Sequence, residues 1–175
     1  MQSLRLFTDI AMTKPAINVL FLCTHNSARS VLAEAVLNHI GKGRFRGFSA
    51  GSHPRSNVNP LSLQVLAEAG IDTAGLRSKG WDEFSRPDAP RMSLVITVCD
   101  NAAGEVCPYW PGLPATAHWG YPDPSAVEGS DEDRLTAFRQ TLLQIRKRLE
   151  LLINLPLPAL ERVALQDAVR RLAKQ

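Results

Sequence analysis

Short apolar runs alternate with amphipathic segments along most of this chain. The runs at 18–23, 45–50, 94–99 and 115–119 have the length and composition of buried strands. Apolar residues recur at helical spacing in three segments, 31–40, 60–70 and 131 to about 154. Strands that alternate with helices predict an α/β fold, with a parallel, doubly wound sheet and right-handed crossovers.

Capping residues set the ends of these helices. Gly41 follows the first amphipathic segment, and Gly70 follows the second. Asn59 precedes Pro60, a pair typical of a helix N-cap and first turn. The irregular stretch 71–91 is expected to hold one further short helix.

The two ends of the chain differ from its middle. We expect residues 1–16 to form an N-terminal extension, 17–153 a single catalytic domain, and 154–175 a C-terminal helical extension. Pro156 and Pro158 break the chain before this extension, and its apolar positions recur near helical spacing over 159–172. The pattern allows this helix to fold back onto the domain or to pair with another subunit.

Composition narrows the classes of protein that fit. With 175 residues, 45% hydrophobic and 21% charged, the chain is typical of one globular domain, without an apolar run long enough for a bilayer or a signal peptide. A net charge of +3 with scattered basic residues favours solvated helix faces over a nucleic-acid surface. Three cysteines, an odd number, predict reactive thiols in a reducing cytoplasm.

The segment after the first strand carries the strongest candidate chemistry. Cys23 ends the strand, Arg29 follows six residues later, and a helix begins there. Backbone N–H groups of such a loop and helix N-terminus favour an anion, and a guanidinium holds two of its oxygens. The expected oxyanion-binding residues are Thr24, His25, Asn26, Ser27, Ala28, Arg29 and Ser30. The same positive environment is expected to favour the Cys23 thiolate. The alternative is a buried structural cysteine in a βα unit.

Topology predicts which other residues join this loop. Active sites of open parallel sheets lie at the carboxyl ends of the strands. Cys23, Cys99 and the loop after Trp119 all follow such ends, so we expect them to converge. The three cysteines and four histidines lack the close spacing of a zinc site, so no metal is expected, and His39, His53 and His118 are read as surface or packing residues.

Over residues 17–153, the chain resembles the arsenate reductases of the low-molecular-weight protein tyrosine phosphatase fold. The matching motifs are 23–30, 49–51, 58–60, 70–72, 95–99, 118–120 and 123–124. The resemblance implies a flavodoxin-like three-layer sandwich, with a four-stranded parallel sheet and helices on both faces. The C-terminal extension lies outside the shared pattern.

The resemblance also implies a reaction, the reduction of arsenate to arsenite for arsenic detoxification. Cys23 would form a covalent arsenate adduct held by Arg29, and Cys99 would resolve it as a disulfide. Cys107 would shuttle that disulfide outward, and Asp123 would assist proton transfer. No bound cofactor is implied; the external reductant is expected to be thioredoxin, with glutaredoxin or glutathione left open.

Three alternatives remain at this stage. A tyrosine phosphatase of the same fold would use Cys23, Arg29 and Asp123 to hydrolyse phosphotyrosine through a cysteinyl-phosphate. A non-catalytic module would only sense the anion. In the third alternative Cys99 is only a buried strand-end cysteine, Cys107 an incidental loop cysteine and Asp123 a turn residue.

The chain departs from the family pattern at several positions. His25 stands where many members have glycine, and the Cys99–Cys107 spacing is one residue longer than in thioredoxin-coupled members. Lys79 stands where members with a structural potassium ion have an acidic residue. We therefore expect its ammonium to replace that ion, with Glu34 and Ser49 as partners; a solvent-exposed lysine is the alternative.

Overall fold

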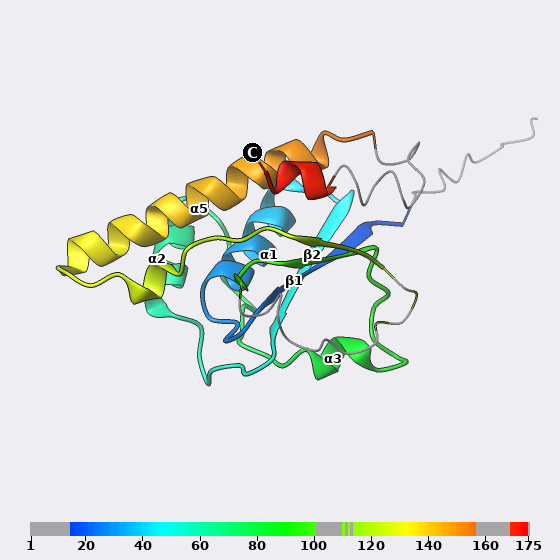
Figure 1. The fold of residues 1–175 in the computed structure, drawn as a ribbon, viewed down its shortest axis with the longest axis horizontal. Helices are drawn as coiled ribbons and strands as arrows, with labels where there is room; N and C mark the ends of the chain where they lie inside the picture. The colour runs from blue at the N-terminus through cyan, green and yellow to red at the C-terminus, as the bar shows by residue number, and fades with distance from the viewer. Residues whose placement is uncertain (1–14, 101–109, 111, 113, 157–168, 175) are drawn as a thin grey trace, which may run out of the picture.

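A four-stranded parallel sheet organises the protein in the computed structural model (Figure 1). Its strands are β1 (Ile17–Cys23), β2 (Phe45–Gly51), β3 (Leu94–Thr97) and β4 (Ala115–His118), in the spatial order β2-β1-β3-β4. The predicted flavodoxin-like sheet is confirmed. The structure describes residues 15–100, 110, 112, 114–156 and 169–174.

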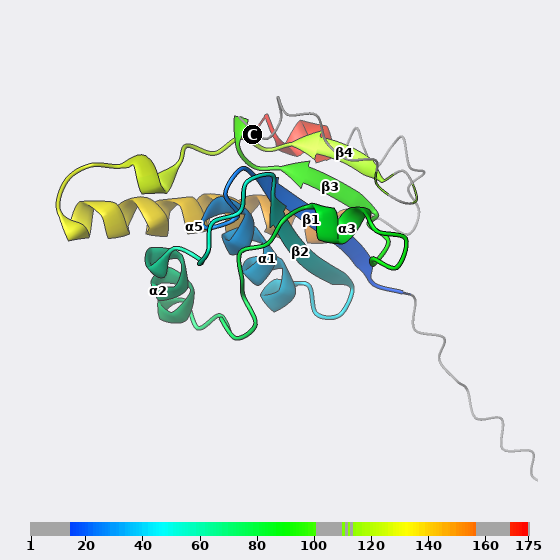
Figure 2. The same cartoon turned by 90° about the horizontal axis from the view of Figure 1, so that it is seen from below.

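Helices lie on both faces of the sheet, as predicted, but the two layers are unequal. Helices α1 (Arg29–Ile40), α2 (Pro60–Glu68) and α5 (Asp131–Ile153) belong to one side, and the four-residue α3 (Asp82–Ser85) covers the opposite face (Figure 2). The larger core lies under α1 and α5, where apolar side chains of β1 and β3 are fully buried. The smaller core beneath α3 combines aliphatic side chains of β1 and β3 with the aromatic rings of Phe48, Trp81, Phe84 and Trp110.

Local chemistry explains the element boundaries. The Asn59 side chain accepts a hydrogen bond from the Leu61 N–H at 2.9 Å, as its predicted N-cap role requires. Ser130 and Asp133 form a reciprocal capping box at the start of α5. Strand β3 ends at Thr97, two residues earlier than predicted. There the pairing changes, because the Val98 carbonyl accepts from the Tyr121 N–H at 3.3 Å beyond the end of β4.

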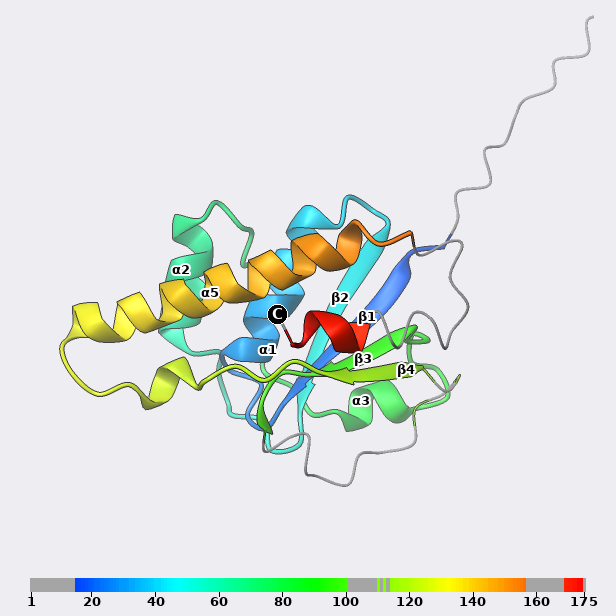
Figure 3. The same ribbon diagram turned by 45° about the horizontal axis from the view of Figure 1, so that its top comes forward.

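The C-terminal residues 169–174 pack against the same domain (Figure 3). Val169 is fully buried and Leu172 is 6% exposed, and the Trp119 indole N–H donates to the Val169 carbonyl at 3.0 Å. For these residues the fold-back alternative is confirmed; the rest of the predicted helix, 159–168, lies outside the described residues. Within the described ranges, no helix is both long and apolar enough to span a membrane.

Candidate active site

The loop between β1 and α1 turns its carbonyl groups away from its centre. Each of the carbonyls of Thr24, His25 and Ser27 accepts a hydrogen bond from outside the loop. The donors are the N–H groups of His53, Arg55 and Asn59 and the hydroxyls of Ser62 and Ser78. Because the carbonyls are occupied on the outside, the peptide units present their N–H groups inward, as an anion cradle requires.

Asn26 and Gly51 maintain the shape of this loop. Asn26 adopts a left-handed conformation, with φ of 46°, and is fully buried. Its side-chain amide donates to Ser30 Oγ at 2.8 Å, and its amide oxygen accepts from the Lys79 N–H at 2.9 Å. A Cβ atom on Gly51 would lie 2.5 Å from the Thr24 carbonyl oxygen, so only glycine permits this close approach.

The N-terminus of α1 adds its unpaired N–H groups to the cradle. Its N-cap is Ala28, which makes no side-chain hydrogen bond, and the first turn carries no acidic residue. In most helices a capping oxygen would satisfy these donors. Here the helix N-terminus faces the loop centre without such a cap, an arrangement that favours an anion.

Arg29 lies across the mouth of the loop. Its Nη1 donates to the Tyr121 carbonyl at 2.9 Å, and its Nη2 lies 3.4 Å from Asp123 Oδ2. The side chain is only 13% exposed, and its Nε is buried without a partner among the described residues. A buried, charged donor that lacks an acceptor is costly, so the guanidinium is suited to receive an oxyanion.

Asp123 lies beside Arg29 at the N-cap of the 3-10 helix η1 (Pro124–Ala126). Its Oδ1 accepts from the Ser125 N–H at 2.9 Å and the Ser125 hydroxyl at 2.7 Å. Partial burial alone would raise the pKa of Asp123. The Ser125 hydrogen bonds and the charges of Arg29 and Arg55 outweigh it and lower the pKa. Asp123 is therefore a carboxylate at neutral pH.

Cys23 and Cys99 lie against each other beneath the loop. Both are buried, Cys99 is close enough to act on the pKa of Cys23, and the Cys99 sulfur lies 3.7 Å from the Thr24 hydroxyl oxygen. The hydrogen bond with Cys99 and burial raise the pKa of Cys23, against the opposing effects of Arg29 and the Thr24 N–H. The expectation that the surroundings favour the Cys23 thiolate is wrong for the reduced, ligand-free site. It counted the cationic neighbours and not the second thiol.

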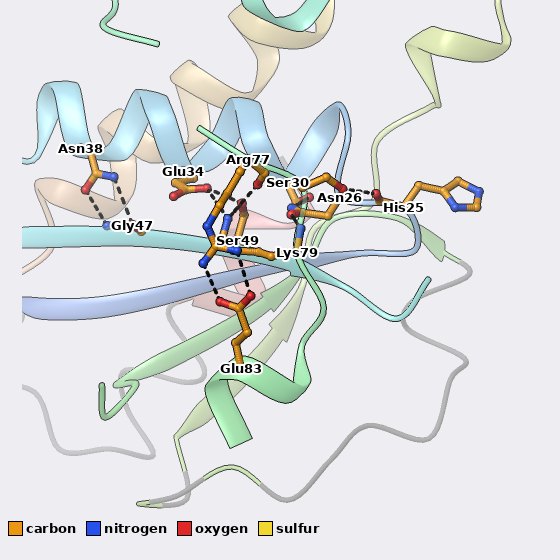
Figure 4. A network of polar contacts seen from close by, with 11 residues as sticks. His25, Asn26, Ser30, Glu34, Asn38, Gly47, Ser49, Arg77, Lys79 and Glu83 are labelled. Carbon is orange, nitrogen blue, oxygen red and sulfur yellow. Dashed lines mark hydrogen bonds and ion pairs between the residues drawn. The ribbon is translucent and has the colours of Figure 1, made fainter. Parts of the chain in front are cut away.

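A buried ion pair supports the loop from behind (Figure 4). Lys79 Nζ lies 3.4 Å from Glu34 Oε2, 3.3 Å from Ser49 Oγ and 3.1 Å from the Arg77 carbonyl oxygen. Ser49 donates to the same Glu34 carboxylate. Burial lowers the pKa of Lys79, while Glu34 opposes this effect. The predicted partners are confirmed, and the solvent-exposed alternative is wrong because Lys79 is 8% exposed.

The predicted convergence is confirmed for the residues that the structure describes. Cys23, Arg29, Cys99 and Asp123 meet at the carboxyl edge of the sheet, whereas Cys107 lies outside the described residues. His118 bridges two residues that flank Cys99: its Nδ1 is 2.7 Å from Thr97 Oγ1 and its Nε2 is 2.9 Å from Asp100 Oδ1.

Tyr121 was expected to pack or to line the mouth of the site, and sequence reasoning missed three contributions to it. These are Tyr121, through its carbonyl, Ser125, through its two hydrogen bonds to Asp123, and Arg55, through its charge. Only Ser125 leaves a sequence signal, because Asp-Pro-Ser is typical of an Asp-capped turn. No group of three or more His, Cys, Asp or Glu side chains in the described part of the chain could hold a metal ion.

This fold, with a cysteine and an arginine on one anion loop, defines a class of phosphatase-like enzymes. The chain belongs to the low molecular weight phosphotyrosine protein phosphatase family, whose model matches residues 18–165. Within it, the chain is 35% identical over 132 residues to an arsenate reductase of Halalkalibacterium halodurans, covering 75% of this chain and 91% of that protein.

Solved structures point to the same group. An arsenate reductase of Archaeoglobus fulgidus superposes with a TM-score of 0.61 at 29% identity, covering 78% of this chain and 99% of that one. A thioredoxin-dependent arsenate reductase of Corynebacterium glutamicum superposes with a TM-score of 0.54 at 27% identity, covering 79% of this chain and 64% of that one.

Proposed function

We propose that this protein reduces arsenate to arsenite, with Cys23 as nucleophile and Cys99 as the resolving thiol. The observation that carries the proposal is the contact between the two buried thiols inside an oxyanion cradle. Hydrolysis of a phosphate ester needs one such thiol, whereas a two-electron reduction needs a pair. The similarity to arsenate reductases supports the same reaction.

The reaction proceeds through a covalent adduct and a disulfide. The Cys23 sulfur attacks arsenic while Arg29 and the loop N–H groups hold the oxygens, and one oxygen leaves as water. The Cys99 thiolate then attacks the Cys23 sulfur. The S–S bond forms, the S–As bond breaks, and its electron pair reduces As(V) to As(III), which leaves as arsenite. An ionised Asp123 accepts or returns a proton at the mouth of the loop.

A dithiol must then supply two electrons to reduce the Cys23–Cys99 disulfide. Both sulfurs are buried, so a large reductant requires a shuttle, and Cys107 is our candidate for it. Thioredoxin is the reductant that we propose, because a thioredoxin-dependent arsenate reductase is among the similar structures. Such a cycle belongs in a reducing compartment, the cytoplasm.

Phosphotyrosine hydrolysis is the second candidate. Asp123 supports it, because its carboxylate lies 3.4 Å from Arg29 and is therefore close to any ester that Arg29 binds. However, this hydrolysis has no role for the second buried thiol beside Cys23, so arsenate reduction accounts for more of the site.

The two candidates are separated by one assay set. Arsenate-dependent NADPH oxidation is measured with thioredoxin and thioredoxin reductase, for the wild type, Cys99→Ser and Cys107→Ser. We expect both variants to lose arsenate turnover while each still cleaves p-nitrophenyl phosphate. Brisk phosphatase activity in all three proteins, with no arsenate turnover by any thiol donor, would leave a phosphatase.

A further inference from the structure

The C-terminal segment 169–174 is part of the core, although it lies beyond the residues that the family model matches. It forms a short helix beside α5 (Figures 1 and 3). The Trp119 indole donates to the Val169 carbonyl, and Trp119 is itself 1% exposed. The segment therefore packs directly behind the chain that leads from β4 to Asp123.

Arg148 of α5 links this segment to the active-site loop. Its Nη2 donates to the Ala173 carbonyl at 3.3 Å, and its guanidinium carbon lies 4.7 Å from the centre of the Tyr121 ring. Its Nη1 is buried without a partner in the part of the chain that the structure describes. The guanidinium is thus held between one carbonyl of the C-terminal segment and the face of one aromatic ring.

Tyr121 passes this contact on to Arg29. Its ring is 6% exposed, and burial raises its pKa to about 12, so the ring stays neutral beneath the Arg148 cation. Its N–H donates to the Val98 carbonyl, and its own carbonyl accepts from Arg29 Nη1 at 2.9 Å. With Asp123, this carbonyl is one of the two groups that orient the Arg29 guanidinium.

We propose that Arg148, seated by the C-terminal segment, is a positioning residue for Arg29. This inference rests on the proposed function only in that Arg29 holds the oxyanion. A cavity of about 650 Å³ borders Gly120, Tyr121, Pro122 and Arg148, so the 120–122 segment has room to shift once its ring is released. The contact of Arg148 with the Tyr121 ring and the Ala173 carbonyl, here called the clamp, prevents that shift. It keeps the Arg29 guanidinium in the plane that matches two oxygens of the substrate.

The test compares two full-length variants with matched controls. Arg148→Met keeps the apolar stem and removes the guanidinium, and Arg146→Met does the same on an exposed turn of α5. Leu172→Asp detaches the segment by placing a charge in a buried position. Arg171→Asp adds the same side chain at an exposed position. The measurements are the dissociation constant for inorganic phosphate, the KM and kcat for p-nitrophenyl phosphate, and Tm.

We expect Arg148→Met and Leu172→Asp each to raise the dissociation constant for phosphate by about three- to tenfold. For p-nitrophenyl phosphate, KM should change more than kcat. Both control variants should behave as the wild type. The double variant should bind phosphate no more weakly than either single variant, because both substitutions remove the same clamp. Unchanged phosphate affinity in Arg148→Met, even with a lower Tm, would overturn the inference, and this variant alone decides if Leu172→Asp does not fold. If the wild type shows no arsenate turnover while Arg148→Met still weakens phosphate binding, the proposed reductase function is refuted and the positioning role of Arg148 stands.

Discussion

The buried thiols of Cys23 and Cys99 lie close enough to interact, although they come from different strand ends of the sheet. Strand β1 pairs with β3, so Cys23 and the residues that follow Thr97 leave the same edge side by side. This pairing gives the nucleophile a neighbour that is able to form a disulfide with it. It also lowers the reactivity of Cys23 until substrate or a base removes a proton from the pair.

Removal of the second thiol should make Cys23 more acidic. In Cys99→Ala the hydrogen bond that raises the pKa of Cys23 is lost, while Arg29 and the Thr24 N–H still lower it. The pH of half-maximal alkylation of Cys23 by iodoacetamide should therefore fall. Peptide mass spectrometry at each pH measures Cys23 separately from the other thiols. An unchanged or higher midpoint in Cys99→Ala would show that Cys99 does not control this ionisation.

Loss of the Lys79 ammonium should weaken both the fold and the loop. Lys79→Met leaves the Glu34 carboxylate largely buried without its cation, and breaking a buried pair in this way costs about 3–5 kcal/mol. The backbone N–H of Lys79 donates to the Asn26 side chain, so a shift of this residue after loss of its ion pair should reach the oxyanion loop. Denaturant unfolding and phosphate titration measure the two effects.

Potassium provides a second test of the Lys79 ammonium, in the smaller variant Lys79→Ala. If the ammonium occupies the place of a cation, added potassium should raise the Tm of Lys79→Ala and leave the wild type unchanged. Equal responses of the two proteins to potassium and to sodium would argue against that role of Lys79.

Substitution of Asp123 should affect ester hydrolysis more than arsenate reduction. A phosphotyrosine leaving group needs a proton from a positioned acid, an effect worth about 10²–10⁴-fold, whereas arsenate can lose an oxygen that is already protonated. Asp123→Asn should therefore lower kcat for phosphotyrosine strongly and the arsenate turnover less. Ser125→Ala removes one hydrogen bond that lowers the pKa of Asp123, so the pKa should rise. Because ester hydrolysis needs the protonated acid, the alkaline limb of its pH profile should then move to higher pH. Equal losses in both reactions would refute this division of roles.

A single methyl group at Gly51 should displace the loop. In Gly51→Ala the new Cβ would meet the Thr24 carbonyl at 2.5 Å, so the backbone must move. Displacement of reacting groups by about 1 Å costs about 10²-fold in rate. Gly80→Ala is the matched control, because Gly80 pairs with Gly51 and the new methyl group would lie 3.8 Å from Pro54 Cγ, an ordinary contact. Similar kcat/KM values for the two variants would show that the close approach at Gly51 is not needed.

The sequence was sufficient for the fold and for most of the active-site set. Apolar runs located the strands, Asn59 marked a helix start, and the rule that active sites lie at strand ends predicted that Cys99 lies near Cys23. The Lys79 pairing followed from the family pattern. These features are encoded by local residue types or by topology.

Other features left no local signal. The Tyr121 carbonyl that orients Arg29 belongs to a backbone group that every residue has, so no residue type marks it. The pKa of Cys23 depends on a balance between burial, Arg29 and Cys99. Whether the pKa rises or falls depends on how these groups lie around the sulfur, which the sequence does not give. The contact of Arg148 with Tyr121 joins two residues whose side chains are common on any protein surface.

The most direct test of the two-thiol mechanism is a single turnover without external reductant. The reduced protein is mixed with one equivalent of arsenate, quenched with acid and alkylating agent, and assayed for arsenite and for disulfides by mass spectrometry. Our account predicts one arsenite per chain and a disulfide that includes Cys99, with neither product in Cys23→Ser or Cys99→Ala. Arsenite formed by Cys99→Ala at the wild-type yield, or no arsenite from the wild type, would contradict it.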